Sequence, residues 1–259
     1  MVLSFTIQTK NGISWHCERQ GTGPHIVLIP SGEGDCGSFS EVGRLLASSF
    51  TVTTFDMPGM SRTTAPTSCT KSVTGQLLAS QIVVLLDALS IDAATFYGSS
   101  SAAIAALALA AYHPDRVRNI VIHEAPLIHF RSLKFLCALP DLALVPACQY
   151  VFGHVMNENH AAWKALGPEF HARLEKNYVL WAREYARSIP NLRLTDEEYR
   201  QRPITWTIGS LTPGNTFASN LEVGRRIGIK VELLYCKHFP QVSIPETLAE
   251  HIERAALKQ

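Results

Sequence analysis

The sequence predicts an α/β protein with a mostly parallel eight-stranded sheet, an N-terminal antiparallel hairpin and a helical cap. Eight strand-like runs are separated for the most part by helical patterns, which is typical of a doubly wound sheet. The inner runs are continuously apolar, as in strands buried on both faces. Asn11-Gly12 lies between the first two runs, and this dipeptide favours a hairpin turn.

Along the chain, the expected strands span residues 4–9, 13–20, 25–30, 51–56, 94–99, 119–125, 204–209 and 230–236. The expected helices span residues 38–49, 73–89, 101–112, 217–227 and 245–257. Residues 127–200 interrupt this alternation with helical patterning only. We therefore expect a core formed by residues 1–126 and 201–259 and a cap formed by residues 127–200, placed where ligands are enclosed.

Composition narrows the class of protein. Of the 259 residues, 46% are hydrophobic and 17% are charged, so a packed core is expected rather than disorder. A net charge of +1 argues against a nucleic-acid partner. The longest apolar run, residues 102–112, is too short to span a membrane. Scattered cysteines and an N-terminus without a signal-peptide pattern predict a cytoplasmic protein with reduced thiols. The sequence is compatible with a homodimer.

A glycine loop follows the third strand. Gly32-Glu-Gly34-Asp-Cys-Gly37 matches the GxGxxG pattern, and Asp56 ends the next strand at about the distance of a ribose-binding acid. Glu33 and Asp35, however, would repel a pyrophosphate. The loop also follows the third strand rather than the first, so a dinucleotide site is the weaker interpretation. We expect Asp56 to stabilise the turn that follows it.

A second motif joins the fifth strand to the next helix. Gly98-Ser-Ser100-Ser-Ala102 is a strand–turn–helix segment with the pattern Gly-x-Ser-x-Ala, which is the nucleophile elbow of an α/β-hydrolase with Ala as its last residue. Small residues are needed because the turn is sharp and brings strand and helix close together. Ser100 is the candidate nucleophile, and the alternative is an ordinary serine helix cap.

A serine nucleophile needs a base and an orienting acid. Of the ten histidines, only His238 lies between the last strand and the last helix. The acid usually follows the seventh strand, but residues 204–213 contain no carboxylate. Glu124 ends the sixth strand, at the edge where active sites form, and is assigned as the acid. The alternative for Glu124 is an ion pair with Arg116 or Arg118.

The remaining groups follow from this assignment. One oxyanion amide commonly comes from the loop after the third strand, and the other from the residue after the nucleophile. Gly32 and Ser101 fit these two positions, so the glycine loop is expected to bind an oxyanion. His123 alternates to the other side of its strand and is expected to be structural.

With these residues placed, the chain closely resembles the zearalenone lactonohydrolases of the α/β-hydrolase superfamily. The most specific stretches are Thr53-Thr-Phe-Asp-Met-Pro-Gly-Met-Ser-Arg62, His171-Ala-Arg-Leu174, Trp181-Ala-Arg183 and His238-Phe-Pro240. The family triad falls on Ser100, Glu124 and His238. The chain departs from the family pattern at Ser31, Ala102 and Ala125.

The resemblance also implies a substrate pocket. Trp181 would stack on the resorcylic ring, and the neighbouring pocket positions would be Phe130, Met156, Tyr185, Pro190 and Phe217. The alternative for each of these residues is ordinary cap core. The resemblance implies that the opened acid then loses carbon dioxide.

The motifs therefore predict a hydrolase that acts through an acyl-enzyme, and the resemblance implies that it opens the ester bond of an apolar macrolactone, detoxifying a mycotoxin such as zearalenone. No organic cofactor is expected, and no metal, because the histidines lack HExxH or comparable spacing. A generic carboxylesterase or carbon–carbon hydrolase would share the triad. A hormone-sensing receptor of the same fold would bind ligand with little turnover.

Overall fold

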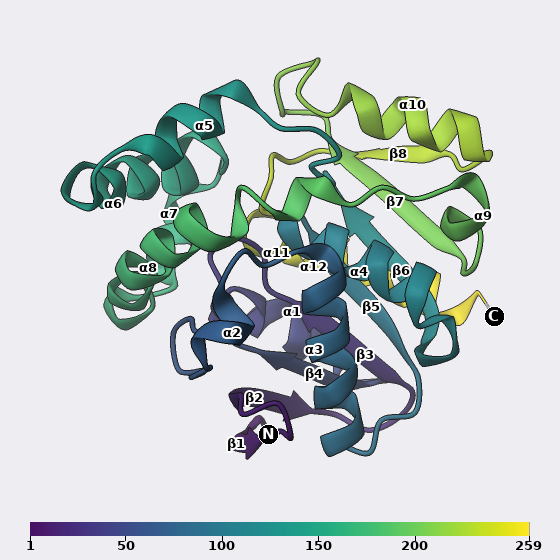
Figure 1. The fold of residues 1–259 in the computed structure, drawn as a ribbon. Coiled ribbons are helices and arrows are strands. Elements are labelled where there is room, and N and C mark those ends of the chain that lie inside the picture. The colour runs from purple at the N-terminus through teal and green to yellow at the C-terminus, as the bar shows by residue number, and fades with distance from the viewer. Residues whose placement is uncertain (259) are drawn as a thin grey trace.

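The computed structural model describes residues 1–258, which form one eight-stranded sheet in the order β1-β2-β4-β3-β5-β6-β7-β8 (Figure 1). The strands are β1 Leu3–Gln8, β2 Ser14–Gln20, β3 His25–Ile29, β4 Thr51–Phe55, β5 Ala94–Ser99, β6 Val117–His123, β7 Ile204–Gly209 and β8 Val231–Leu234. Strand β2 runs antiparallel to β1 and β4, and all other neighbouring pairs are parallel. The predicted fold class is confirmed.

The predicted strands agree closely with the observed ones, and β6 shows the largest difference. It spans Val117–His123 rather than residues 119–125. Glu124 has a φ of 48°, so the backbone leaves the extended conformation directly after His123. This turn sets the direction of the Glu124 side chain.

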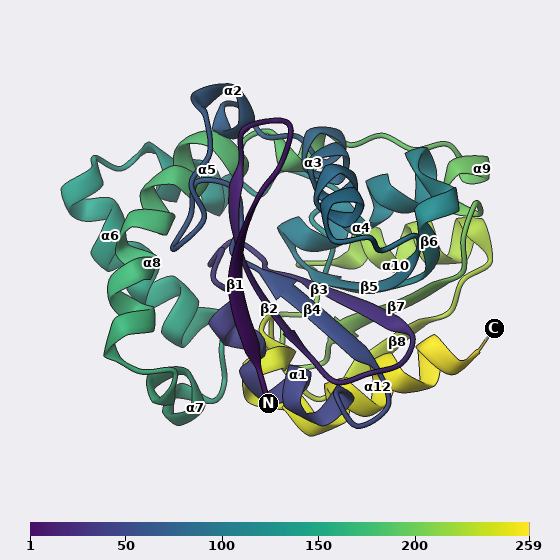
Figure 2. The ribbon, with the colours of Figure 1, turned by 90° about the horizontal axis from the view of Figure 1, so that it is seen from below.

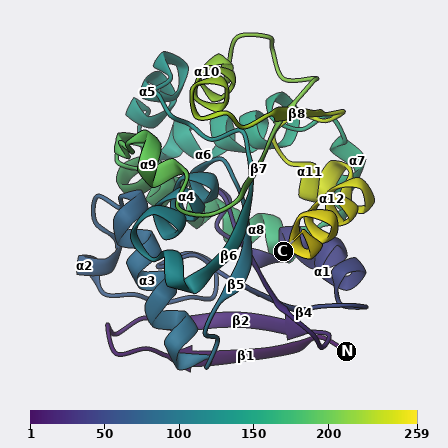
Figure 3. The same cartoon turned by 90° about the vertical axis from the view of Figure 1, so that its right-hand side faces the viewer.

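Helices cover both faces of the sheet, as Figures 2 and 3 show, with α1 and α12 on one face and α3, α4 and α10 on the other. The α-helices are α1 Ser40–Leu46, α2 Thr67–Thr70, α3 Gly75–Ala88, α4 Ser101–Tyr112, α5 Arg131–Ala138, α6 Asp141–Tyr150, α7 His160–Ala165, α8 Pro168–Leu180, α9 Asp196–Tyr199, α10 Ala218–Ile227, α11 Pro240–Ser243 and α12 Pro245–Leu257. Short 3₁₀ helices span Cys36–Phe39, Pro114–Arg116 and Ile189–Asn191. The alanine-rich α4 is buried over almost its whole length, because small side chains let it approach the sheet closely.

The connection between β6 and β7 is built from helices α5 to α9 and two π-helices, Val151–Val155 and Trp181–Tyr185. Helices α5 to α8 form a layer at one end of the sheet, at the upper left of Figure 1. Side chains of this layer and of the loops at the carboxyl ends of β3, β5, β6 and β8 line a common cavity. The cap therefore encloses the edge of the sheet where the sequence motifs meet.

Two further features concern cysteines and membranes. Each of the six cysteines is buried and free. Within residues 1–258, no helix has both the length and the apolar character that a bilayer crossing needs.

Candidate active site

Ser100 lies in the turn between β5 and α4 with a φ of 53° and a ψ of −124°. Its backbone N–H donates to the carbonyl oxygen of His123 on the neighbouring strand at 2.9 Å. A Cβ atom on Gly98 would lie 2.5 Å from the carbonyl carbon and oxygen of Ala102. The small residues of the Gly-x-Ser-x-Ala pattern therefore allow strand and helix to pass close together, and Ser100 is left half-buried facing the cavity.

Glu124 and His238 form a buried pair. The Nδ1 atom of His238 lies 2.5 Å from the Oε2 atom of Glu124. The backbone N–H of Gly209 donates to the other carboxylate oxygen at 2.9 Å. Burial would raise the pKa of Glu124, but the hydrogen bond with His238 and the nearby His123 lower it, to about 2. Glu124 is therefore a carboxylate at neutral pH and can fix the tautomer of the imidazole.

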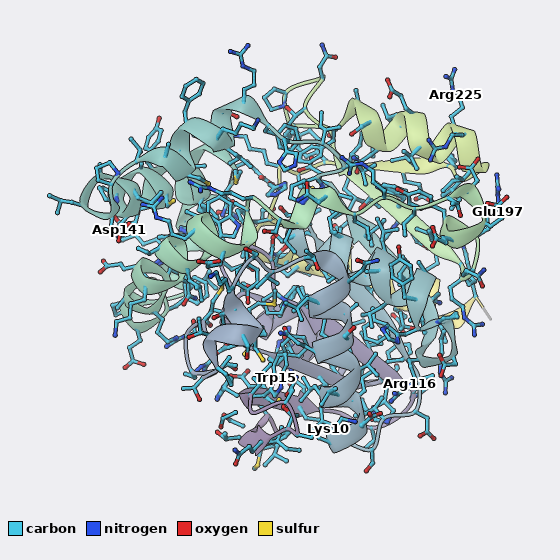
Figure 4. All side chains as sticks on the ribbon, viewed as in Figure 1. Lys10, Trp15, Arg116, Asp141, Glu197 and Arg225 are labelled. Carbon is cyan, nitrogen blue, oxygen red and sulfur yellow. The ribbon has the colours of Figure 1, made fainter. Side chains whose placement is uncertain are left out.

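The alternative partners of Glu124 lie elsewhere. Arg116 donates to Asp87 at 2.7 Å. Figure 4 places Arg116 on the side of the molecule opposite Asp141 of the cap. Arg118 is exposed near the start of β6, whereas Glu124 follows its end. The ion-pair alternative for Glu124 is therefore wrong.

Neighbouring side chains hold this pair in place. His123 is buried, with Nδ1 2.9 Å from Thr207 Oγ1 and Nε2 3.0 Å from the carbonyl oxygen of Lys237. Burial lowers the pKa of His123, which favours the neutral ring. His123 thus fixes the backbone next to His238, a structural role. Asn220 was not predicted as part of the site. Its side-chain oxygen accepts from the backbone N–H of Ala125, the residue after Glu124, and its Nδ2 donates to the carbonyl oxygen of Ala125.

The two predicted oxyanion amides lie on the wall of the same cavity. Ser101 is the first residue of α4, where backbone N–H groups have no acceptor within the helix. Gly32 lies beneath the indole of Trp181, since a Cβ atom on Gly32 would stand 2.6 Å from its Nε1 atom. A residue larger than glycine would displace the indole at this point.

The cavity has a volume of about 320 Å³ and a mainly apolar wall. Of the six positions that the family resemblance implied, five line it, namely Phe130, Met156, Trp181, Pro190 and Phe217. The Phe217 ring stacks on the imidazole of His238, with centroids 5.5 Å apart and an interplanar angle of 15°. Trp181 is 4% exposed and meets Phe152 edge to face.

Tyr185 requires a correction. It is 1% exposed, it does not line this cavity, and its hydroxyl donates to the carbonyl oxygen of Pro58 at 2.7 Å. Its place is therefore in the packing between cap and core. Further lining residues were not predicted, among them Leu133, Leu136, Val151, Phe152, Val155, Ile189 and Phe239. Apolar residues on cap helices carry no sequence signal that separates pocket wall from ordinary core.

The glycine loop, residues 32–37, offers no free acid to a ribose. Both carboxylate oxygens of Asp56 are occupied, by the backbone N–H of Cys36 at 2.9 Å and by Arg62 at 2.7–3.0 Å. Asp56 thus stabilises its own turn, as expected, and also anchors the loop. Glu33 and Asp35 are both fully buried. The dinucleotide interpretation is wrong for this geometry.

One group of side chains within residues 1–258 has the atom types and proximity of a metal site, His16, Glu18 and Cys36, with ligand atoms within 4.8 Å of one another. The guanidinium of Arg62 donates to Glu18 at 3.4 Å and to the sulfur of Cys36 at 3.2 Å. A fixed cation already occupies this position, so the group does not fit a metal ion.

With the fold and the elbow geometry established, comparison with known proteins defines the class. Residues 24–202 match the family model of the alpha/beta hydrolase fold. The enol-lactonase from Burkholderia xenovorans LB400 superposes with a TM-score of 0.73 at 18% identity, over 96% of this chain and 98% of that chain. An H300N mutant of potato epoxide hydrolase superposes with a TM-score of 0.78 at 16% identity, over the whole of both chains. The chain belongs to the alpha/beta hydrolase family.

Two relatives narrow the class further. The chain is 42% identical over 257 residues to a zearalenone hydrolase from Bionectria ochroleuca, covering 98% of this chain and 97% of the relative. It is also 42% identical over 259 residues to a zearalenone hydrolase from Cladophialophora bantiana, covering 99% and 97%. The predicted resemblance to the zearalenone lactonohydrolases is thus confirmed, and the chain is a hydrolase of this fold.

Proposed function

We propose that the chain hydrolyses the ester bond of a resorcylic acid macrolactone such as zearalenone, with Ser100 as nucleophile. The observation that carries this proposal is the His238–Glu124 pair, which borders the same apolar cavity as Ser100. The 42% identity to two zearalenone hydrolases supports the substrate class. No metal or organic cofactor is part of the proposal.

In the first half of the reaction, His238 accepts the proton of the Ser100 hydroxyl while Oγ attacks the lactone carbonyl carbon. The amides of Gly32 and Ser101 donate to the resulting oxyanion. The intermediate collapses, the ring C–O bond breaks, and His238 returns the proton to the departing alkoxide. The product is an acyl-enzyme whose alcohol remains tethered to the acyl chain.

In the second half, a water molecule attacks the acyl carbon and His238 takes its proton. The ester bond to Ser100 breaks, Oγ recovers the proton, and the ring-opened hydroxy acid leaves. Glu124 stabilises the imidazolium at both stages, because it is buried and ionised.

The cavity wall suits a flat ring fused to an alkyl macrocycle. The indole of Trp181 and the rings of Phe130 and Phe217 offer apolar and aromatic surface, and aromatic faces stack with offset geometry.

The test compares kcat/KM for zearalenone and for p-nitrophenyl acetate under multiple-turnover conditions. We expect many turnovers and a higher kcat/KM for the macrolactone. Faster turnover of the small ester would favour a generic esterase, and a burst limited to one equivalent per protein would favour a ligand receptor. Either result would contradict the proposal.

A further inference from the structure

Helix α8 and the residue that follows it present three side chains to the glycine loop. Arg173, Asn177 and Trp181 are four residues apart, so they lie above one another on one helix face. They contact the loop in reverse order along the chain: Trp181 meets Gly32, Asn177 meets Glu33, and Arg173 meets Asp35. One cap helix thus contacts three of the first four residues of the loop.

Asn177 makes the central contact. It is 1% exposed, and its Nδ2 donates to the carbonyl oxygen of Glu33 at 2.7 Å and to Ser61 Oγ at 2.8 Å. Its Oδ1 accepts from the backbone N–H of Ser61 at 2.8 Å. Three of the four hydrogen bonds an asparagine amide can form are therefore satisfied in a buried place, where breaking them is costly.

Arg173 adds a two-point ion pair. Its Nε lies 2.6 Å from Oδ2 of Asp35 and its Nη2 lies 3.2 Å from Oδ1. Asp35 is fully buried and also accepts from the backbone N–H of Gly37 at 2.9 Å. A guanidinium–carboxylate pair with two contacts fixes orientation as well as distance. The loop is therefore held on both sides of Gly34.

These contacts constrain Gly32 itself. The Gly32 Cα faces the Trp181 indole, and Asn177 holds the carbonyl of the next residue, Glu33. The Gly34 N–H lies in the same peptide plane as the Glu33 carbonyl that Asn177 holds, and it donates to the carbonyl oxygen of Ser31 at 3.1 Å. Because the Ser31 carbonyl and the Gly32 N–H share one peptide plane, this hydrogen bond restrains the direction of the Gly32 N–H. The direction of this N–H decides whether it can donate to an oxyanion.

We propose that Asn177 and Arg173 are positioning residues, which hold the glycine loop against α8 so that the Gly32 amide points at the reacting carbonyl oxygen. This inference rests on the proposed function, in which that amide stabilises the oxyanion. The cap then contributes to the chemistry as well as to substrate binding.

The test measures kcat and KM with p-nitrophenyl acetate, which is too small to depend on stacking against Trp181. We expect Asn177→Ala to lower kcat about tenfold or more, below the roughly 10²–10³-fold effect of removing an oxyanion donor, with KM within twofold of wild type. Asn177→Asp retains the acceptor for Ser61 and loses the donor to Glu33, so it should show the same loss. Arg173→Gln changes a partly exposed side chain and should give a smaller loss in the same direction.

Glu184→Ala is the matched control. Glu184 accepts from the backbone N–H of Ser72 at 2.7 Å, which is a contact between cap and core away from the glycine loop. Its removal should leave kcat unchanged. An equal loss of kcat in Glu184→Ala, or wild-type kcat in Asn177→Asp, would overturn the proposal, since the effect would then not depend on the bond to Glu33.

Amide hydrogen exchange gives a readout that does not need activity. We expect faster exchange in peptides covering residues 31–37 of Asn177→Ala and Arg173→Gln than in wild type or Glu184→Ala. Unchanged exchange in both variants would overturn the proposal even if the proposed function holds. If wild type hydrolyses neither zearalenone nor the ester, the proposed function fails, and the exchange result still decides whether these residues hold the loop.

Discussion

Ser100 and Glu124 both have positive backbone φ values, of 53° and 48°. Each follows directly after a parallel strand, β5 or β6, at the edge of the sheet that meets the cavity. Such conformations are unfavourable for residues with a Cβ atom and occur often at functional sites. The sequence places both residues at strand ends, because apolar runs reveal where strands stop. It carries no signal for the dihedral angles that direct their side chains.

Substitutions of Trp181 distinguish stacking on the substrate from packing within the cap. We predict that Trp181→Ala lowers kcat/KM for zearalenone at least about tenfold, since an aromatic contact and its buried area are lost. Trp181→Phe retains an aromatic ring and should keep a larger share of the activity. The rates are measured by chromatography, and circular dichroism checks the fold. Full activity in folded Trp181→Ala would exclude the stacking role.

Glu33 makes stability depend on pH. Burial raises its pKa from 4.5 to about 7, although hydrogen bonds from its own backbone and from Ser38 oppose this. The folded protein thus keeps this proton to higher pH than the unfolded chain, and the contribution of Glu33 to stability falls as pH rises from 4.5 to about 7.

Glu33→Gln removes this titration and resembles the protonated acid in shape. We expect the variant to gain stability relative to wild type as pH rises, by up to on the order of 3 kcal/mol above pH 8. Urea denaturation at pH 5 and pH 8.5 measures the difference. A difference that does not change with pH would show that Glu33 is not a buried acid with a raised pKa.

At the scale of elements, the hydrophobic pattern of the sequence predicted the regular helices and strands but not the local irregularities within them. The bounds of β5, β7, α4 and α12 agree with the predicted ranges. The two π-helices next to the cavity, Val151–Val155 and Trp181–Tyr185, were not predicted. One widened turn inside a helix changes the spacing of apolar residues too little to be recognised, although such turns are frequent at functional sites.

The crossing of β5 and α4 gives a prediction at this scale. Gly98→Ala places a Cβ atom 2.5 Å from the backbone of Ala102, so strand and helix must separate. We expect a loss of stability of about 3 kcal/mol, because backbone cannot yield as a side chain does. Gly214→Ala is the control, since no atom lies within 4 Å of its added Cβ. Differential scanning calorimetry should show a lower melting temperature for Gly98→Ala alone, and equal values would contradict the close approach.

At the scale of the whole molecule, the contacts between cap and core include two of the loops that carry the site. Asn177 binds the glycine loop, and the carbonyl oxygen of Met156 accepts from the backbone N–H of His238 at 3.0 Å. Alternation of strands and helices predicted the layers and the helical insertion. It could not predict these attachments, because they join residues far apart in the sequence through backbone groups that every residue has.

These attachments predict that cap and core unfold together. Trp163 and Trp181 lie in the cap, whereas Trp15 and Trp206 lie on strands of the core. Tryptophan fluorescence and far-ultraviolet circular dichroism should therefore report the same single transition in urea. Two separate transitions would mean that the cap is an independent unit.

The role of Ser100 is tested most directly by incubating the protein with zearalenone and following the intact lactone by chromatography. Wild type, Ser100→Ala and Ser80→Ala are compared, because Ser80 is an exposed serine of α3 and controls for the substitution itself. The account predicts loss of lactone with wild type and Ser80→Ala and none with Ser100→Ala. Equal loss with all three proteins would contradict the assignment of Ser100, and no loss with any of them would contradict the substrate class.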